Sequence, residues 1–231
     1  MIYLDNIDNQ IKNEILETLK EIYTIYPKLE NLISLVSDSN YLVNYIAQNF
    51  KKSNSLESLR ASCNNDNTLF TTTAQYKPEK INKTYYNTGE SALDFLLKTK
   101  PDFIGIGVKS NCSYDVSISR IEKGYNLGWS YSRNIRDAVY HELGHIFSII
   151  FKLPYIEDIR ELLEESMYDE SLSGYAKTNM EEMISEAFSM YSYNPYYSEL
   201  VYMVGTSINS LYQIYHKTEL FNAPTKSLIK K

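Results

Sequence analysis

The residues best suited to chemistry lie in one short segment, His141-Glu142-Leu143-Gly144-His145, inside a helical pattern. Side chains four residues apart share a helix face, so both imidazoles can reach one metal ion while Glu142 points to the side of that ion. Apolar residues repeat on the opposite face and are expected to bury the helix and fix the ligands: Val139, Leu143, Ile146 and Ile150. The segment therefore predicts a metal centre, and a charged surface turn is the alternative.

A catalytic zinc ion takes three protein ligands and keeps one position open, so the chain must supply a third ligand. A further histidine six residues after His145 would complete one known pattern, but Ile150 and Phe151 lie there instead. His216 lies far downstream, near the end of the last predicted helix, and is expected to be a surface or packing residue. The third ligand is therefore expected to be a carboxylate from a later helix.

Periodicity separates the acidic residues of that later helix. Glu182 and Glu186 lie four residues apart on one face beside an apolar stripe, whereas Glu181 points elsewhere and is expected to be a solvated first-turn residue. We assign Glu182 as the third ligand and Glu186 as an acceptor that orients a ligand histidine through its other ring nitrogen. The alternative interpretation is that Glu182 and Glu186 are both ordinary surface acids.

This helix pair resembles a gluzincin, and the second half of the chain is similar to the anthrax-lethal-factor-type group, which includes the Pro-Pro endopeptidases of clostridia. The resemblance covers about residues 125–195 and includes Tyr175, which lies seven residues before Glu182. It implies that the tyrosine faces the substrate. A similar Ser-x-Tyr-Ala-x-x-Asn-x-x-Glu segment also occurs in phage-encoded metallopeptidase-like proteins.

The residue types then suggest a mechanism for peptide hydrolysis with Zn²⁺ as cofactor. Glu142 is expected to be the general base for the metal-activated water, and Tyr175 is expected to donate a hydrogen bond to the oxyanion. An ordinary packing role is the alternative for Tyr175, because the chain has 22 tyrosines. The substrate is expected to be a peptide or protein in extended conformation, paired with an edge strand over residues 125–131.

We therefore expect a zinc-dependent endopeptidase. One alternative is a catalytically silent zincin-fold binding protein, such as a phage-associated or inhibitory factor, acting through its N-terminal helices. Another is a regulatory peptidase that cleaves a single intracellular target.

Composition excludes several other classes of protein. The chain has 231 residues, of which 43% are hydrophobic, and a formal net charge of -6, so it offers phosphates no extended basic surface and nucleic acid is not an expected partner. No apolar run is long enough to span a membrane, and the first residues do not look like a secretory signal. A cytoplasmic location is therefore expected, with delivery by another route left open.

Cys63 and Cys112 are too few for a disulfide framework, and thiol catalysis is not expected.

The expected fold class is α+β: a zincin-like domain over residues 63–222 with a small mixed sheet, an N-terminal helical lobe over residues 1–62 and a polar tail over residues 223–231. In the lobe, helices are expected over 3–26 and 28–50, with a break near residues 37–40, and a protein partner for them is possible. The other expected helices cover 91–98, 132–150, 155–167, 179–194 and 196–216, and the expected strands cover 68–76, 103–108 and the region of 116–121. Gly105 and Gly107 are interpreted as packing positions within a strand, because a dinucleotide site would need a third glycine and a following helix.

Overall fold

The computed structural model describes residues 1–50, 56–65, 67–76 and 100–217. Among these residues, helices and one small mixed sheet occur together, which confirms the α+β class. The described residues divide into two compact units: the first includes residues 1–6, 26–50, 56–65, 67–76, 100–110, 216 and 217, and the second includes residues 7–25 and 111–215. The predicted helix over 91–98 and the predicted tail over 223–231 lie outside the described residues.

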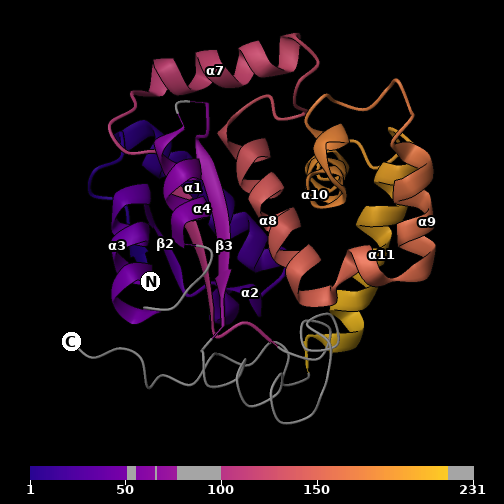
Figure 1. Cartoon of the computed structure of the whole chain (residues 1–231), viewed down its shortest axis with the longest axis horizontal. Helices are drawn as coiled ribbons and strands as arrows, with labels where there is room; N and C mark the ends of the chain where they lie inside the picture. The colour runs from indigo at the N-terminus through magenta and orange to yellow at the C-terminus, as the bar shows by residue number, and fades with distance from the viewer. Residues whose placement is uncertain (51–55, 66, 77–99, 218–231) are drawn as a thin grey trace. The chain divides into compact units, whose positions relative to one another are not determined.

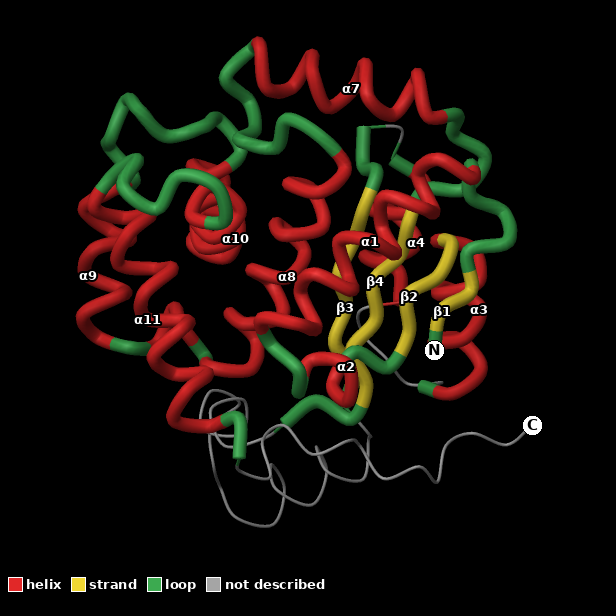
Figure 2. Tube along the Cα trace, turned by 180° about the vertical axis from the view of Figure 1, so that it is seen from behind, coloured by secondary structure: helices red, strands yellow, loops and turns green. Residues whose placement is uncertain are grey.

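The sheet belongs to the first unit. Among the described residues it has four strands: β1 (Ile2–Tyr3), β2 (Leu35–Asp38), β3 (Phe70–Gln75) and β4 (Phe103–Val108). The strand order is β1-β2-β4-β3, in which β2 pairs in parallel with both β1 and β4, whereas β3 is antiparallel to β4 (Figure 2). The strand predicted over 103–108 is confirmed, and the one predicted over 68–76 is confirmed with shorter ends.

Residues 1–62 are not purely helical, and that part of the prediction is wrong. Strand β1 begins the chain, and β2 interrupts the helix predicted over 28–50, leaving α2 (Leu29–Leu32) before it and α3 (Ser39–Asn49) after it. Asp38 ends the strand and caps the helix, because its carboxylate accepts a hydrogen bond from the Tyr41 N–H at 3.0 Å. The helical pattern is thus interrupted over residues 33–38, slightly before the break expected near 37–40, because β2 pairs with β4.

Helices α3 and α4 (Leu56–Asn64) belong to the same unit as the sheet and contribute to its core. A Cβ atom added to Gly105 would lie 2.7 Å from Leu42 Cδ1, and one added to Gly107 would lie 2.9 Å from Leu42 Cδ2. These contacts confirm that the two glycines are packing positions. The core cluster of this unit comprises Leu35, Leu42, Ile46, Phe50, Leu59, Cys63 and Phe103.

The second unit is helical. Its helices, with two short 3-10 turns, are α1 (Asn9–Ile25), α7 (Tyr114–Asn126), α8 (Ile135–Phe151), η1 (Leu153–Tyr155), α9 (Glu157–Ser166), η2 (Ala176–Thr178), α10 (Met180–Tyr191) and α11 (Glu199–Tyr215). The four helices predicted after residue 131 are confirmed, with ends that differ by a few residues. Helix α1 corresponds to the helix predicted over 3–26.

The strand predicted around residues 116–121 is wrong, because this region forms helix α7. The β-branched residues there suggested a strand, but local helix features decide the outcome. The Ser113 hydroxyl caps the helix by accepting from the Val116 N–H, and Asp115 and Lys123 lie at the ends where the helix dipole favours their charges. The Tyr114 hydroxyl also donates to Glu14 Oε1 of α1 at 2.7 Å.

The edge strand predicted over 125–131 is also wrong. Its first two residues end α7, and Gly128 adopts a left-handed conformation with φ of 66°. The carbonyl oxygens of Gly128 and Trp129 accept hydrogen bonds from the N–H groups of Gly174 and Tyr175 at 2.9 and 2.7 Å. A neighbouring segment of the same chain thus occupies the backbone groups that were expected to pair with a substrate.

The described residues include no membrane-spanning helix and no disulfide between Cys63 and Cys112. None of their helices combines the length and apolar character that crossing a bilayer requires. Cys63 and Cys112 are both free thiols, so they are not paired.

Candidate metal centre

Helix α8, which carries His141 and His145, is anchored at its first turns. The Asn134 side chain caps the helix by accepting from the Asp137 N–H at 2.9 Å. The Arg136 guanidinium donates to both carboxylate oxygens of Glu21 on α1, at 2.7 and 3.1 Å, and the Tyr140 hydroxyl donates to the same carboxylate at 3.0 Å. These bonds fix the helix in the turns that lead to the first histidine.

Helix α10 packs closely against α8, and the two lie side by side in Figure 1. The approach depends on small residues, since a Cβ atom added to Gly144 would lie 2.6 Å from the Cα atom of Ser185. Ser189 also donates its hydroxyl hydrogen to the Asp137 carbonyl oxygen at 2.8 Å, and both residues are buried. At the start of α10, the Asn179 side chain accepts from the Glu182 N–H at 2.9 Å, which fixes the backbone of this acid.

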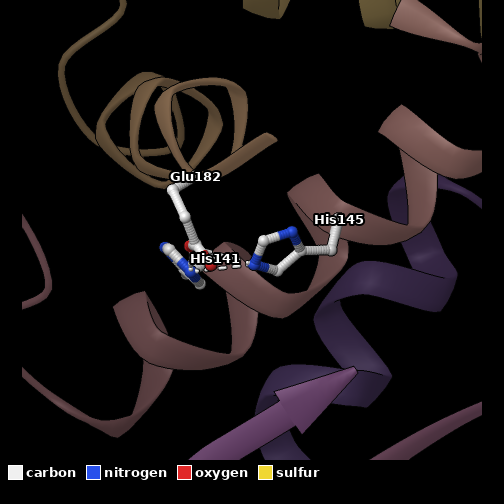
Figure 3. Close-up of side chains that lie close together, drawn as sticks. All are labelled: His141, His145 and Glu182. Carbon is white, nitrogen blue, oxygen red and sulfur yellow. Dashed lines mark hydrogen bonds and ion pairs between the residues drawn. The ribbon is translucent and has the colours of Figure 1, made fainter. Parts of the chain in front are cut away.

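Figure 3 shows the side chains of His141 and His145 from α8 and Glu182 from α10 pointing toward one another. Glu182 Oε2 lies 3.1 Å from His141 Nε2 and 3.2 Å from His145 Nε2, and the two Nε2 atoms are 3.2 Å apart. Ligand atoms about 2.0–2.1 Å from a tetrahedral zinc ion lie about 3.3 Å from one another. The three atoms therefore have the spacing that one such ion requires. No other set of potential metal ligands of this kind occurs among the described residues, and His216 is not part of the cluster.

Glu186 has no exposed surface and lies behind His141. Its Oε1 lies 3.0 Å from His141 Nδ1, the ring nitrogen that does not face the other ligands. It also accepts hydrogen bonds from the Ser130 hydroxyl at 3.0 Å, the Tyr131 N–H at 2.6 Å and the Ser173 hydroxyl at 2.9 Å. Glu186 thus occupies the position that the predicted orienting role requires, and it also joins two loops to the histidine.

The acidic surroundings favour positive charge at this site. Burial lowers the pKa of His141, but hydrogen bonds to Glu182 and Glu186 and the charge of Glu142 outweigh it and raise the pKa to about 10. Burial raises the pKa of Glu182, but hydrogen bonds from His141 and His145 outweigh it and hold the pKa well below its usual range. The Glu182 carboxylate is therefore negatively charged at neutral pH and suited to bind a cation.

Tyr175 lies directly beside the three ligands. Its hydroxyl donates to Glu182 Oε1 at 3.1 Å, and its ring stacks on the His141 ring with centroids 5.6 Å apart and on the Trp129 ring with centroids 5.9 Å apart. Burial, together with the negative charges of Glu182 and Glu142, raises the pKa of Tyr175 far above its usual range. The hydroxyl is therefore a neutral hydrogen-bond donor at neutral pH.

Glu142 is buried, with 6% of its surface exposed. Its negative charge raises the pKa of both His141 and Tyr175, so it lies within electrostatic reach of the ligand cluster. Glu181, the neighbouring acid on α10 that was expected to be solvated, is exposed. The structure therefore brings His141, His145, Glu182, Glu186 and Tyr175 into contact and separates Glu181 from them.

Sequence reasoning missed the residues that hold the two loops around Glu186. These are Ser130 and Tyr131 before α8, Ser173 before α10, and Trp129, the chain's one tryptophan. Ser173 could have been found from the sequence, because it lies at a fixed position in the Ser-x-Tyr-Ala segment. In the structure its hydroxyl also accepts a hydrogen bond from the Ala176 N–H at 3.0 Å. Nothing in the local pattern of residues 129–131 indicated contact with a segment more than 40 residues later.

Neither a scan against protein-family models nor searches of curated proteins and of solved structures found a match to this chain. The geometry and chemistry of the site are therefore what indicate the function of this chain.

Proposed function

We propose that this chain is a zinc-dependent endopeptidase with a zincin-like arrangement of its two site helices. The observation that supports the proposal is the spacing of the His141, His145 and Glu182 ligand atoms, which lie 3.1–3.2 Å from one another. Two imidazole nitrogens and one carboxylate oxygen form a donor set typical of catalytic zinc, which keeps a fourth position for water or substrate. The contact between Glu186 and His141 Nδ1 also fits zinc, because ligand histidines commonly donate their other N–H to a carboxylate.

When bound to these three residues, zinc supplies Lewis-acid activation of a water molecule and of the scissile carbonyl group. The chain's own residues move the protons. Glu142 follows a ligand histidine directly and is buried, so its carboxylate is desolvated beside the reacting groups. It accepts the proton of the attacking water and returns that proton to the leaving amine, a role typically worth about 10²–10⁴-fold in rate.

The resemblance of the His-Glu-x-x-His and glutamate helices to those of gluzincins supports a peptide or protein as the substrate. The similarity of about residues 125–195 to the group that includes the Pro-Pro endopeptidases supports cleavage within a chain rather than at its end.

Profiling of new N-termini tests this proposal. Denatured bacterial lysate proteins are incubated with wild-type protein, with Glu142→Gln or with Glu181→Gln, each loaded with zinc. Wild type and Glu181→Gln should generate the same new N-termini, because Glu181 is exposed and outside the cluster. Glu142→Gln should bind the same amount of zinc and generate about 10²–10⁴-fold less cleavage product.

Identical products from all three proteins, or from none of them, would contradict an endopeptidase with Glu142 as its base. If none of them cleaves while zinc is bound, the alternative of a binding protein without turnover takes its place.

A further inference from the structure

The two oxygens of the Glu182 carboxylate have different partners. Oε2 faces His141 Nε2 and His145 Nε2 at 3.1 and 3.2 Å, the position of a metal ligand. Oε1 accepts a hydrogen bond from the Tyr175 hydroxyl at 3.1 Å. The carboxylate is therefore oriented with one oxygen toward the histidines and the other toward the tyrosine.

Tyr175 is held firmly enough to impose this orientation. Its N–H donates to the Trp129 carbonyl oxygen at 2.7 Å, and its own carbonyl oxygen accepts from the Thr178 N–H at 3.0 Å and hydroxyl at 2.7 Å. Its ring stacks on both His141 and Trp129. Backbone and ring are thus fixed independently, and the hydroxyl is presented to one oxygen of Glu182.

A carboxylate can bind a metal ion through one oxygen or through both. Binding through both oxygens would use a coordination position that a catalytic zinc ion needs for water or substrate. A hydrogen bond donated to one carboxylate oxygen keeps that oxygen turned away from the ion. Only the other oxygen is then left to coordinate the ion. Such bonds to metal-binding carboxylates orient them and tune metal affinity.

We infer that Tyr175 is a positioning residue for Glu182: its hydroxyl holds Oε1 so that Glu182 binds the ion through Oε2 alone and the fourth position stays open. This inference depends on the proposed metal site. It differs from the oxyanion role predicted from the sequence, because a phenol hydroxyl has one hydrogen and cannot donate it to Glu182 and to an oxyanion at the same time.

Tyr175→Phe separates the two roles, because phenylalanine keeps both ring contacts and removes only the hydroxyl. The zinc dissociation constant is measured by competition with a chromophoric chelator, and coordination is followed by the visible absorption of the cobalt-substituted protein. We expect zinc affinity about 10–100-fold lower in the variant. We also expect weaker cobalt absorption bands, since a second carboxylate oxygen raises the coordination number.

Tyr114→Phe is the matched control. It removes a tyrosine hydroxyl that also donates to a glutamate carboxylate, Glu14, at 2.7 Å, but this glutamate is not in the ligand cluster. Its zinc affinity and cobalt spectrum should equal those of wild type. In a Glu182→Ala background, Tyr175→Phe should cause no further loss of zinc affinity, because the hydroxyl then has no ligand oxygen to hold.

Unchanged zinc affinity and an unchanged cobalt spectrum in Tyr175→Phe would overturn the inference, and a loss of cleavage alone would then assign the hydroxyl to the oxyanion. An affinity loss of the same size in the Glu182→Ala background would overturn it as well. Failure of the proposed metal site is distinguishable, because it would be visible as an absence of zinc binding by the wild-type chain itself.

Discussion

The two compact units differ in the ionisable side chains that they bury: among the described residues, the sheet unit buries Asp38, which caps α3, and the helical unit buries a larger set on α8 and α10. In the unit that contains the sheet, the core cluster consists of aliphatic and aromatic side chains and the thiol of Cys63. In the other unit, helices α8 and α10 also bury ionisable side chains: Asp137, His141, Glu142 and Glu186. Burying a charge is costly unless partners compensate it, and several partners surround Glu186 and His141.

This difference indicates that the apolar cluster of the sheet unit mainly stabilises the fold, whereas the buried ionisable residues of α8 and α10 mainly serve the candidate site. An apolar cluster stabilises a fold through burial and packing alone. A buried set of histidines and carboxylates is a poor source of stability, so its presence is best explained by a ligand that needs it. Changes in the two regions should therefore have separable consequences.

The largest expected effect on stability is in the apolar cluster of the sheet unit. Ile46 has no exposed surface, and Ile46→Ala should lower the free energy of unfolding by about 2–5 kcal/mol, because it removes buried methyl groups and leaves a cavity. Denaturant unfolding measures this change, with the exposed Gln48 on the same helix changed to alanine as the control. Zinc stoichiometry of the folded fraction should be unchanged. If Ile46→Ala loses zinc while its free energy of unfolding changes little, the expectation that the two regions have separable effects is contradicted.

The next largest effect is expected behind His141. Glu186→Gln keeps the size of the side chain but removes the negative charge beside His141 Nδ1, and zinc affinity should fall about 10–100-fold. Chelator competition measures this change, and Glu181→Gln, on an exposed residue of the same helix, should match wild type. Equal affinities in all three proteins would leave Glu186 as a structural residue alone.

A third expected effect is a pH dependence of the stability of the chelator-treated protein. The raised pKa of His141, about 10 against an ordinary 6.5, stabilises the fold below about pH 6.5 and ceases to do so as the pH rises toward 10. The titratable groups that face His141 are Glu142, Glu182, Glu186, His145 and Tyr175. Unfolding in chelator should therefore be easier at about pH 9 than at about pH 6.

Saturating zinc replaces the proton on His141, so the loss of stability at high pH should become smaller when zinc is present. The same decline with and without zinc would show that another group causes it. His141→Ala in chelator is the control, and its decline over this range should be weaker than that of wild type.

The sequence predicted well what local patterns determine. Helices α8 and α10 have regular apolar stripes and asparagine caps, Asn134 and Asn179, so their extents and the faces of their charged residues followed from periodicity. The spacing within His141-Glu142-Leu143-Gly144-His145 similarly restricted the positions that the two imidazoles could take.

The errors occurred where distant contacts decide the structure. Strand β2 has only four residues and depends on pairing with β4, about 70 residues later. The segment around Trp129 bonds to the backbone of Gly174 and Tyr175 rather than forming an edge strand. The hydrogen bond of Tyr175 to Glu182 Oε1 could not be predicted either, because sequence spacing does not distinguish the two oxygens of a carboxylate.

The central claim is that one divalent cation is held by His141, His145 and Glu182. Zinc titration of the purified, chelator-treated protein, followed by elemental analysis after dialysis, tests this claim most directly. We predict about one zinc ion per chain in the wild type and much less zinc retained after dialysis in His141→Ala or Glu182→Ala. Wild-type protein that retains no zinc, or variants that retain as much as the wild type, would contradict the account.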